Sequence, residues 1–107
     1  MKPIKELRVL VIGKNQEILA TLKRIIENNE GWKAEILSEE DECFEQLKTQ
    51  LFDLLLLSSG LEEAFEERVK VFASELPNPV KVIEHFGGGS GLLKNEVYQT
   101  FPELFVQ

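Results

Sequence analysis

The chain has 107 residues, of which 43% are hydrophobic and 29% are charged, and its formal net charge is −7. This composition is that of a globular protein and excludes a disordered or collagen-like chain. The negative charge repels nucleic-acid phosphates and anionic membranes, so neither is an expected partner. No apolar run approaches the roughly 20 residues that span a bilayer, and no secretory signal is found, so we expect a cytoplasmic location.

The cysteine content limits the chemistry further. The only cysteine, Cys43, excludes an internal disulfide and offers no zinc-ligand spacing, so we expect no metal and no cofactor. Its place on the apolar face of a predicted helix is typical of a small core residue. The length predicts one domain over residues 1–107.

The N-terminal part of the chain predicts a strand followed by a helix. Residues 7–12 are a run of branched apolar residues, which is typical of a central parallel strand buried on both faces. Asn15 can cap the helix that follows, and residues 28–31 are expected to end it, with Gly31 as a left-handed stop. The apolar positions of this helix recur at helical spacing, at Ile18, Leu19, Leu22, Ile25 and Ile26.

The middle of the chain predicts a second strand, a second helix and a third strand. Residues 32–37 form the second strand, with one face made by Trp32, Ala34 and Ile36. Ser38, followed three residues later by Asp41, resembles a capping box. The apolar stripe of the helix consists of Cys43, Phe44 and Leu47. Residues 53–57 predict the third strand. Acidic runs at 39–42 and 62–67 are expected in first helical turns, where negative charge suits the helix dipole.

The last part of the chain predicts a third helix, a fourth strand and a final helix. The apolar positions of the third helix are Leu61, Ala64, Phe65, Val69, Phe72 and Ala73. Pro77-Asn78-Pro79 breaks the chain before a strand at 80–86. A glycine-rich loop then leads into a helix from about Leu92 to Thr100. Residues 103–107 predict either a short fifth strand or a packed tail.

Two predicted strands and the turns after them resemble a known family. Arg8 to Asn15 reads as a buried strand that runs into a turn, and Asp53 to Gly60 reads as a buried strand that ends in small polar residues. At this spacing they resemble the first and third strands of a response-regulator receiver domain. The resemblance covers roughly residues 7–86. It implies a three-layer, doubly wound parallel sheet of the flavodoxin type, with strand order 2-1-3-4 and room for a short fifth strand. The alternation of strands and helices with tight connections itself predicts an α/β fold with a parallel sheet.

The chain departs from the receiver pattern where the family carries its chemistry. In receivers an acidic pair follows the first strand, the phosphoryl-accepting aspartate ends the third, and a hydroxyl residue ends the fourth. Here Gly13 and Lys14 stand at the acidic pair, Ser58 with its neighbour Ser59 stands at the acceptor, and Glu84 stands at the hydroxyl position. The family's lysine has no clear counterpart. We therefore expect a degenerate pseudo-receiver without aspartyl phosphorylation, because the oxygen ligands for magnesium are missing.

The resemblance also implies that the pseudo-receiver is truncated at its C-terminus. The 21 residues after Phe86, 87–107, are too few for the helix, strand and final helix that complete a receiver. In receivers these elements carry dimerisation and output contacts.

Lys14 allows two interpretations. Its ammonium can occupy the space that a receiver fills with a metal ion, and so hold the pocket in one fixed state. Alternatively, Lys14 is a solvated residue at the start of a helix.

The glycine-rich loop also allows two interpretations. The loop consists of Gly87, Gly88, Gly89, Ser90 and Gly91, and glycines before a helix let backbone amides approach an anion. The segment matches neither a P-loop nor the dinucleotide-binding glycine pattern. It is therefore either a turn after an edge strand or a site for phosphate or another small anion.

A hydrolytic site is disfavoured. Ser58 and His85 arrive on neighbouring strands at one sheet edge, which a nucleophile and its base would require. No Gly-x-Ser-x-Gly motif surrounds Ser58, however, and strand alternation can place His85 on the wrong face. We expect no enzyme.

The sequence is best interpreted as a non-enzymatic, receiver-like signalling or scaffold module that binds a protein partner of unknown identity. The alternative is a small-anion or nucleotide-binding protein that uses the Gly87–Gly91 loop. The C-terminal segment is rich in apolar side chains that either cover the chain's own core or form a homodimer. The candidate interface residues are Leu93, Val97, Phe101, Leu104 and Phe105.

Overall fold

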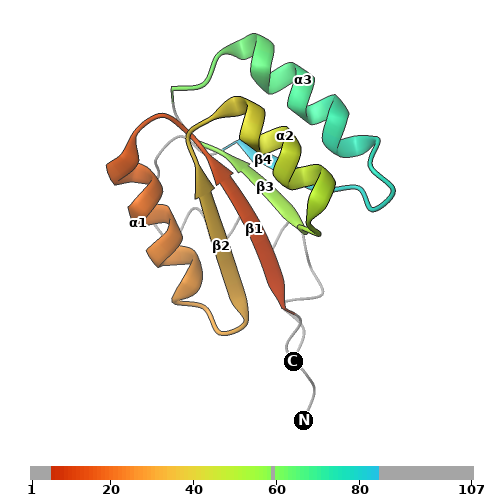
Figure 1. The fold of residues 1–107 in the computed structure, drawn as a ribbon. Helices are drawn as coiled ribbons and strands as arrows, with labels where there is room; N and C mark the ends of the chain where they lie inside the picture. Colours follow the sequence, from red (N-terminus) through yellow and green to blue (C-terminus); the bar gives the residue numbers. More distant parts are fainter. Residues whose placement is uncertain (1–5, 59, 85–107) are drawn as a thin grey trace.

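Four strands alternate with three helices in the computed structural model of the chain, which describes residues 6–58 and 60–84. The elements, drawn in Figure 1, are β1 (Leu7–Ile12), α1 (Gln16–Glu27), β2 (Trp32–Leu37), α2 (Glu40–Thr49), β3 (Leu54–Leu57), α3 (Glu63–Ser74) and β4 (Lys81–Glu84). All strand pairs are parallel, and the order is β2-β1-β3-β4. The predicted α/β class, the doubly wound flavodoxin-like arrangement and the 2-1-3-4 order are confirmed. The predicted fifth strand at 103–107 lies outside the described residues.

Two strand boundaries differ from the prediction. β3 begins at Leu54 and not at Asp53, because the Asp53 carboxylate turns to accept the backbone N–H of Arg8 at 2.9 Å. β4 begins at Lys81 and not at Val80, whose N–H donates to the carbonyl of Ala73 in α3 at 3.1 Å. β1 and β2 have the predicted bounds.

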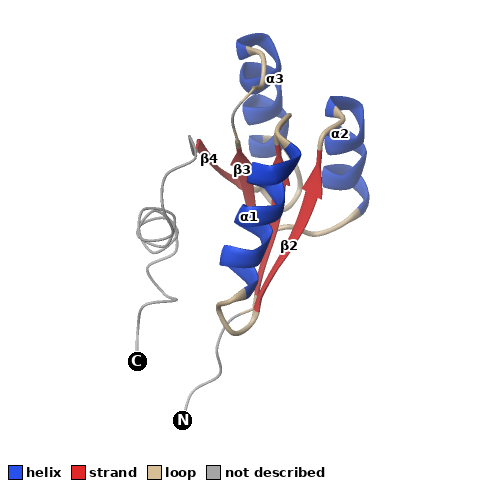
Figure 2. Ribbon diagram, turned by 90° about the vertical axis from the view of Figure 1, so that its left-hand side faces the viewer, coloured by secondary structure: helices blue, strands red, loops and turns tan. Residues whose placement is uncertain are grey.

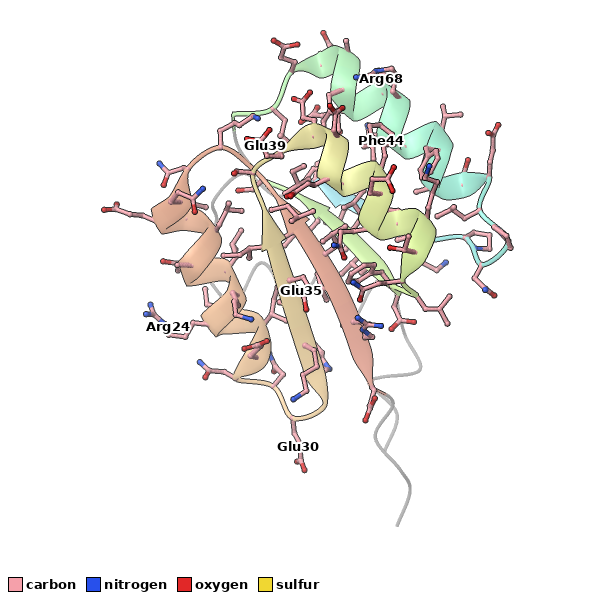
Figure 3. The ribbon with its side chains drawn as sticks, in the orientation of Figure 1. Arg24, Glu30, Glu35, Glu39, Phe44 and Arg68 are labelled. Atoms are coloured by element: carbon pink, nitrogen blue, oxygen red, sulfur yellow. The ribbon has the colours of Figure 1, made fainter. Side chains whose placement is uncertain are left out.

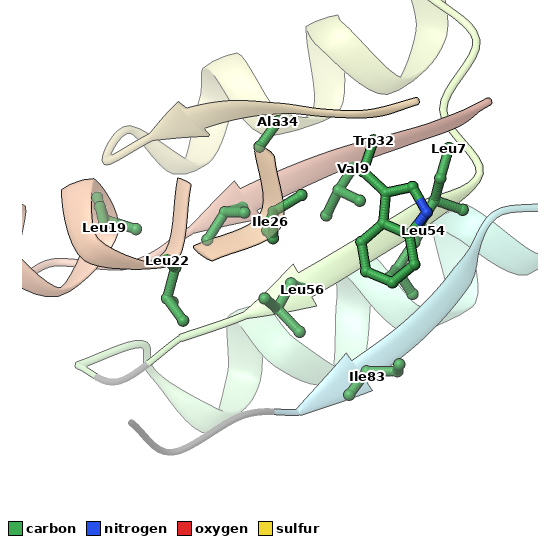
Figure 4. Packing of buried hydrophobic residues seen from close by; sticks show 11 residues of the cluster. Leu7, Val9, Leu19, Leu22, Ile26, Trp32, Ala34, Leu54, Leu56 and Ile83 are labelled. Carbon is green, nitrogen blue, oxygen red and sulfur yellow. The ribbon is translucent and has the colours of Figure 1, made fainter. Parts of the chain in front are cut away.

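Helices cover both faces of the sheet, which gives three layers. Figure 2 shows α1 on one face and α2 with α3 on the other. On the α1 side, strand residues such as Val9 and Leu56 pack with Leu22 and Ile26 (Figure 4). On the opposite side, Leu10 and Leu57 belong to a second cluster with residues of α2 and α3. Each β3 side chain is at most 1% exposed, which explains the uninterrupted leucine run: both faces of a central parallel strand are covered.

The two ends of α1 are satisfied by asparagine side chains. The Oδ1 atom of Asn15 accepts the N–H of Ile18 at 3.0 Å, so the predicted N-cap is confirmed. The helix ends at Glu27, and the side-chain amide of Asn29 donates to the carbonyls of Ile25 and Ile26. The helix thus ends at the predicted segment 28–31, with Asn28 as its cap residue. Gly31 has the predicted positive φ, 85°, and lies in the turn to β2.

The start of α2 contradicts the predicted capping box. The helix begins at Glu40, the cap residue is Glu39, and no side chain caps it, so neither Ser38 nor Asp41 has the predicted role. Three acidic residues in the first turn interact favourably with the helix dipole instead, as expected for the 39–42 run.

The packing of α2 and α3 matches the predicted stripes at all positions but one. Cys43 is fully buried, and burial raises the pKa of its thiol to about 12. The Phe44 ring meets the Phe72 ring edge-on at 5.1 Å, and the Arg68 guanidinium lies 5.6 Å from the Phe44 centroid (Figure 3). Ala64 is exposed, because it lies in the first turn of α3 on the outer side. None of the described helices has the length and apolar character needed to cross a bilayer.

Candidate functional site

Gly13 and Ser58, two of the predicted site residues, meet at the carboxyl ends of β1 and β3. The hydrogen-bond ladder continues one residue past each strand. The N–H of Gly13 donates to the carbonyl of Leu37 at 3.2 Å, and the N–H of Ser58 donates to the carbonyl of Ile12 at 2.8 Å. These bonds fix the two residues side by side at the edge where doubly wound sheets place their ligands.

The contact between Gly13 and Ser58 leaves no space between them. A Cβ built on Gly13 would lie 2.7 Å from the Cβ of Ser58 and 3.2 Å from its Oγ. Real Cβ atoms essentially never approach so closely. Ser58 is 2% exposed and is the one buried polar side chain among the described residues. The position that an acidic side chain occupies in a receiver is therefore closed by direct packing in this chain.

Lys14 links three loops at the same edge. Its Nζ donates to the carbonyl of Ser38, just after β2, at 2.8 Å. Its stem lies against Gly60, just after β3: a Cβ built on Gly60 would lie 2.9 Å from the Cβ of Lys14. Gly60 also has a φ of 88°, which favours glycine at this position. One side chain thus joins the segments that follow β1, β2 and β3.

An open hollow of about 380 Å³ lies over these loops. Its lining residues are Lys14, Glu39, Glu40, Asp41, Gly60 and Glu62. Figure 3 labels Glu39 at this edge, near the start of α2. In the part of the chain that the structure describes, no three His, Cys, Asp or Glu side chains are grouped to hold a metal ion. The acidic residues therefore give the hollow a negative rim without forming a metal site.

Glu84 is near this edge, but α3 holds its carboxylate. β4 places Glu84 in register with Leu57, the residue before Ser58. The carboxylate lies 2.6 Å from the Nζ of Lys70 in α3, and this hydrogen bond raises the pKa of Lys70. Burial, and after it the charge of Glu84, raises the pKa of the nearby Glu66 carboxyl. Glu84 is thus committed to an ion pair with a helix.

The structure brings Gly13, Lys14 and Ser58 together at the carboxyl edge of the sheet. Other predicted residues lie outside the described ranges: Ser59, His85, the loop residues Gly87, Gly88, Gly89, Ser90 and Gly91, and the interface residues Leu93, Val97, Phe101, Leu104 and Phe105.

Gly60 was expected at this edge from its place after the third strand, but two other contributors, the Ser38 carbonyl and Lys70, were not singled out from the sequence. Ser38 follows a strand that neighbours β1, so the predicted strand order could have indicated its carbonyl. Lys70 lies on a helix, and its contact with Glu84 depends on how α3 sits over β4, which no local pattern gives.

A second, smaller hollow of about 130 Å³ lies at the opposite end of the sheet, next to Phe52, Leu76 and Val80. It contains none of the predicted site residues.

Comparisons of the whole chain with protein families, with curated proteins and with solved structures found no match.

Proposed function

We propose that this chain is a pseudo-receiver: a non-enzymatic signalling or scaffold module that binds a protein partner without aspartyl phosphorylation. The observation that supports it best is the contact between Gly13 and Ser58, where a Cβ on Gly13 would lie 2.7 Å from the Cβ of Ser58. The flavodoxin-like sheet has the strand order that receivers use, and the contact fills the space where the resemblance would put the phosphorylation pocket.

The chemistry of the strand ends supports the absence of phosphoryl transfer. An acyl phosphate needs a carboxylate acceptor, and magnesium needs hard oxygen ligands beside it. Ser58 offers a neutral hydroxyl that is 2% exposed, Gly13 has no side chain, and Lys14 has the wrong charge. Glu84, which aligns with the family's switch position, has a carboxylate in place of the hydroxyl and is paired with Lys70 at 2.6 Å.

Lys14 supports a module with one fixed state. A receiver changes its loops when a phosphoryl group and a metal ion are bound. Here the ammonium bonds the Ser38 carbonyl at 2.8 Å and the stem packs on Gly60, with no ligand required. A partner would therefore recognise the same loop arrangement at all times.

The proposal extends to the kind of partner and the location. The partner is a protein, because the net charge of −7 disfavours nucleic acid and anionic lipid. A cytoplasmic location and a homodimer formed by the C-terminal segment belong to the same proposal.

Phosphorylation can be tested directly. The chain is incubated with acetyl phosphate, and separately with beryllofluoride, each with magnesium, beside a phosphorylatable receiver as the positive control. We expect no change in intact mass and none in the fluorescence of Trp32, the only tryptophan. Stoichiometric, magnesium-dependent phosphorylation would refute the proposal.

Partner binding needs its own experiment. The tagged full chain is purified from its native host at low ionic strength, and the recovered proteins are used as bait in the reverse direction. A stoichiometric complex found in both directions supports a binding module. The binding part of the proposal would be contradicted if the first purification recovered the chain alone, or if no recovered protein retained the chain when used as bait.

The alternative, anion binding by Gly87–Gly91, concerns residues outside the described ranges. Titration calorimetry with inorganic phosphate and with ATP distinguishes it, since the pseudo-receiver predicts no heat of binding.

A further inference from the structure

The outer edge of β2 is the surface from which the inference starts. Backbone groups of a strand alternate between its two sides. The carbonyls of Gly31 and Leu37 bond to Leu7 and Gly13 on the β1 side. The backbone N–H and C=O groups of Lys33 and Glu35 therefore also point toward β1. The same groups of Trp32, Ala34 and Ile36 point outward, away from the sheet. Edge groups of this kind can pair with a strand from another chain.

Both outward groups of Ala34 are bonded by one pair of side chains from α1. The Nζ of Lys23 donates to the carbonyl of Ala34 at 2.8 Å, and the N–H of Ala34 donates to the Oε2 of Glu27 at 3.1 Å. Lys23 and Glu27 are themselves joined at 3.0 Å as an i, i+4 ion pair. Together they satisfy one donor and one acceptor of the edge.

The position of this pair is central. Ala34 is the middle one of the three outward-facing residues, and the N–H of Trp32 is already bonded to the carbonyl of Asn29 at 3.0 Å. A strand that approached this edge would have to displace Lys23 and Glu27 before it could form a continuous ladder.

The side chains of β2 fit a second copy of the same strand. In an antiparallel pair centred on Ala34, the two Ala34 residues would exchange both of their backbone hydrogen bonds. Lys33 of each copy would then lie opposite Glu35 of the other, and Trp32 would lie opposite Ile36. Lys33 and Glu35 are both exposed, and Figure 3 labels Glu35 on β2. Opposite charges directly across an antiparallel pair are favourable. Trp32 is 5% exposed and packs in its own core, so the Lys33–Glu35 pairs give the surface its complementarity.

We propose that the outer edge of β2 is a self-complementary strand-pairing surface, which Lys23 and Glu27 keep closed. The occupant that this surface fits is β2 of a second copy, related by a two-fold axis through the two Ala34 residues. A two-fold arrangement closes on itself, so it yields a defined pair and not a fibre.

The experiment removes the Lys23–Glu27 pair and, as a matched control, removes an ion pair elsewhere on the surface. The variant Lys23→Ala/Glu27→Ala is compared with Lys48→Ala/Glu45→Ala, which deletes an exposed ion pair of α2 with the same net charge. Light scattering over a concentration series should give twice the parent's mass for the first variant and the parent's mass for the second. This doubling is expected for a monomeric parent. If the parent is a dimer, each dimer carries two β2 edges, so the mass of the first variant should rise with concentration to at least twice that of the parent.

Amide hydrogen exchange shows where the association occurs. At a concentration below association, the Ala34 amide of the first variant should exchange faster than in the parent, by on the order of tenfold, because its acceptor is gone. The amides of Lys33 and Glu35, which face β1, should be unchanged. At high concentration the Ala34 amide should be protected again. If Lys33 and Glu35 also lose protection, the milder variant Lys23→Met/Glu27→Met, which keeps both apolar stems and removes both hydrogen-bonding groups, replaces the first.

Charge reversal tests the register. Adding Lys33→Glu to the first variant places two carboxylates opposite each other and should return the mass to that of the parent. Adding Lys33→Glu together with Glu35→Lys restores opposite charges and should restore the doubling. An unchanged mass in both the alanine and the milder variants at the highest concentration overturns the proposal, as does association that ignores the charge at Lys33.

Discussion

Two lysines form the same hydrogen bond in two regions of this molecule, with different surroundings. Lys14 donates to the carbonyl of Ser38 and Lys23 donates to the carbonyl of Ala34, each at 2.8 Å. Lys23 is also paired with Glu27 at 3.0 Å, whereas Lys14 forms no ion pair with a described residue although acidic residues line its hollow. The ammonium of Lys23 thus belongs to a neutral pair that closes a strand edge. Among the described residues, the ammonium of Lys14 has only the Ser38 carbonyl as a hydrogen-bond partner, and this bond positions loops.

The comparison also separates steric from electrostatic control. At the strand ends, Gly13 and Ser58 are in direct packing contact and neither is charged. Lys14 adds a hydrogen bond to the Ser38 carbonyl beside them. At the β2 edge the closing interaction is charged and its two side chains are 42% and 36% exposed. Substitutions should therefore cost more at the strand ends, and salt and pH should matter more at the β2 edge.

The largest effect is expected from Gly13→Ala. The added methyl group overlaps the Cβ of Ser58, so we expect a loss of about 1–3 kcal/mol in the free energy of unfolding. Urea denaturation measures it. Ser58→Gly in the same chain removes the overlapping atom and should recover part of the loss. A Gly13→Ala variant as stable as the parent would mean that this contact is not tight.

Lys14→Met should have a smaller effect. It keeps the stem on Gly60 and removes the hydrogen bond to Ser38, which predicts a loss of about 0.5–1.5 kcal/mol. Lys48→Met, at an exposed lysine of α2, is the control and should change little. Equal stability of both variants and the parent would identify Lys14 as a solvated residue and would remove its role as a fixed link between the loops.

Glu27→Gln should destabilise the chain at neutral pH by about 0.2–1 kcal/mol, the range of exposed pairs. The Ala34 N–H and then Lys23 lower the pKa of Glu27, so its charged form stabilises the fold. This contribution is present above the ordinary carboxyl pKa and is lost as the pH falls through the lowered value. Thermal unfolding from neutral to acid pH should show the difference from the parent vanish. A constant difference would exclude the charge as its origin.

Glu66→Gln should show the smallest effect and the opposite sign. Burial and the charge of Glu84 raise the pKa of Glu66, so the charged form is unfavourable in the folded chain. The variant should be slightly more stable than the parent at neutral pH. The gain should disappear below the ordinary carboxyl pKa, where Glu66 is protonated in both states. A loss of stability at neutral pH would contradict the assigned direction.

The sequence predicts the sheet and the packed faces well, because these depend on patterns that are local. The leucine run of β3 and the branched run of β1 correspond to strands covered on both faces. Errors occur where a side chain competes with the backbone. The Asp53 carboxylate accepts the Arg8 N–H, and β3 begins one residue later than predicted.

The candidate site was predicted only in part. The strand order places Gly13 beside Ser58, which the receiver resemblance implied. It does not give the bond from Lys14 to a backbone carbonyl or the capture of Glu84 by Lys70, because these depend on side-chain conformations and on the tilt of a helix. The closing pair on β2 is recognisable as an i, i+4 pair, but its bonds to Ala34 are not.

Because Cys43 is buried, the rate at which its thiol reacts measures how often α2 separates from the sheet. With a pKa of about 12, its thiolate fraction at pH 7 is on the order of 10⁻⁵, so reagents that attack thiolates can label it only when the layer opens. The labelling rate of Cys43 then reports how often this layer detaches, without any engineered probe. It distinguishes movement of α2 from loss of the Lys23–Glu27 pair, which belongs to α1 on the opposite face of the sheet.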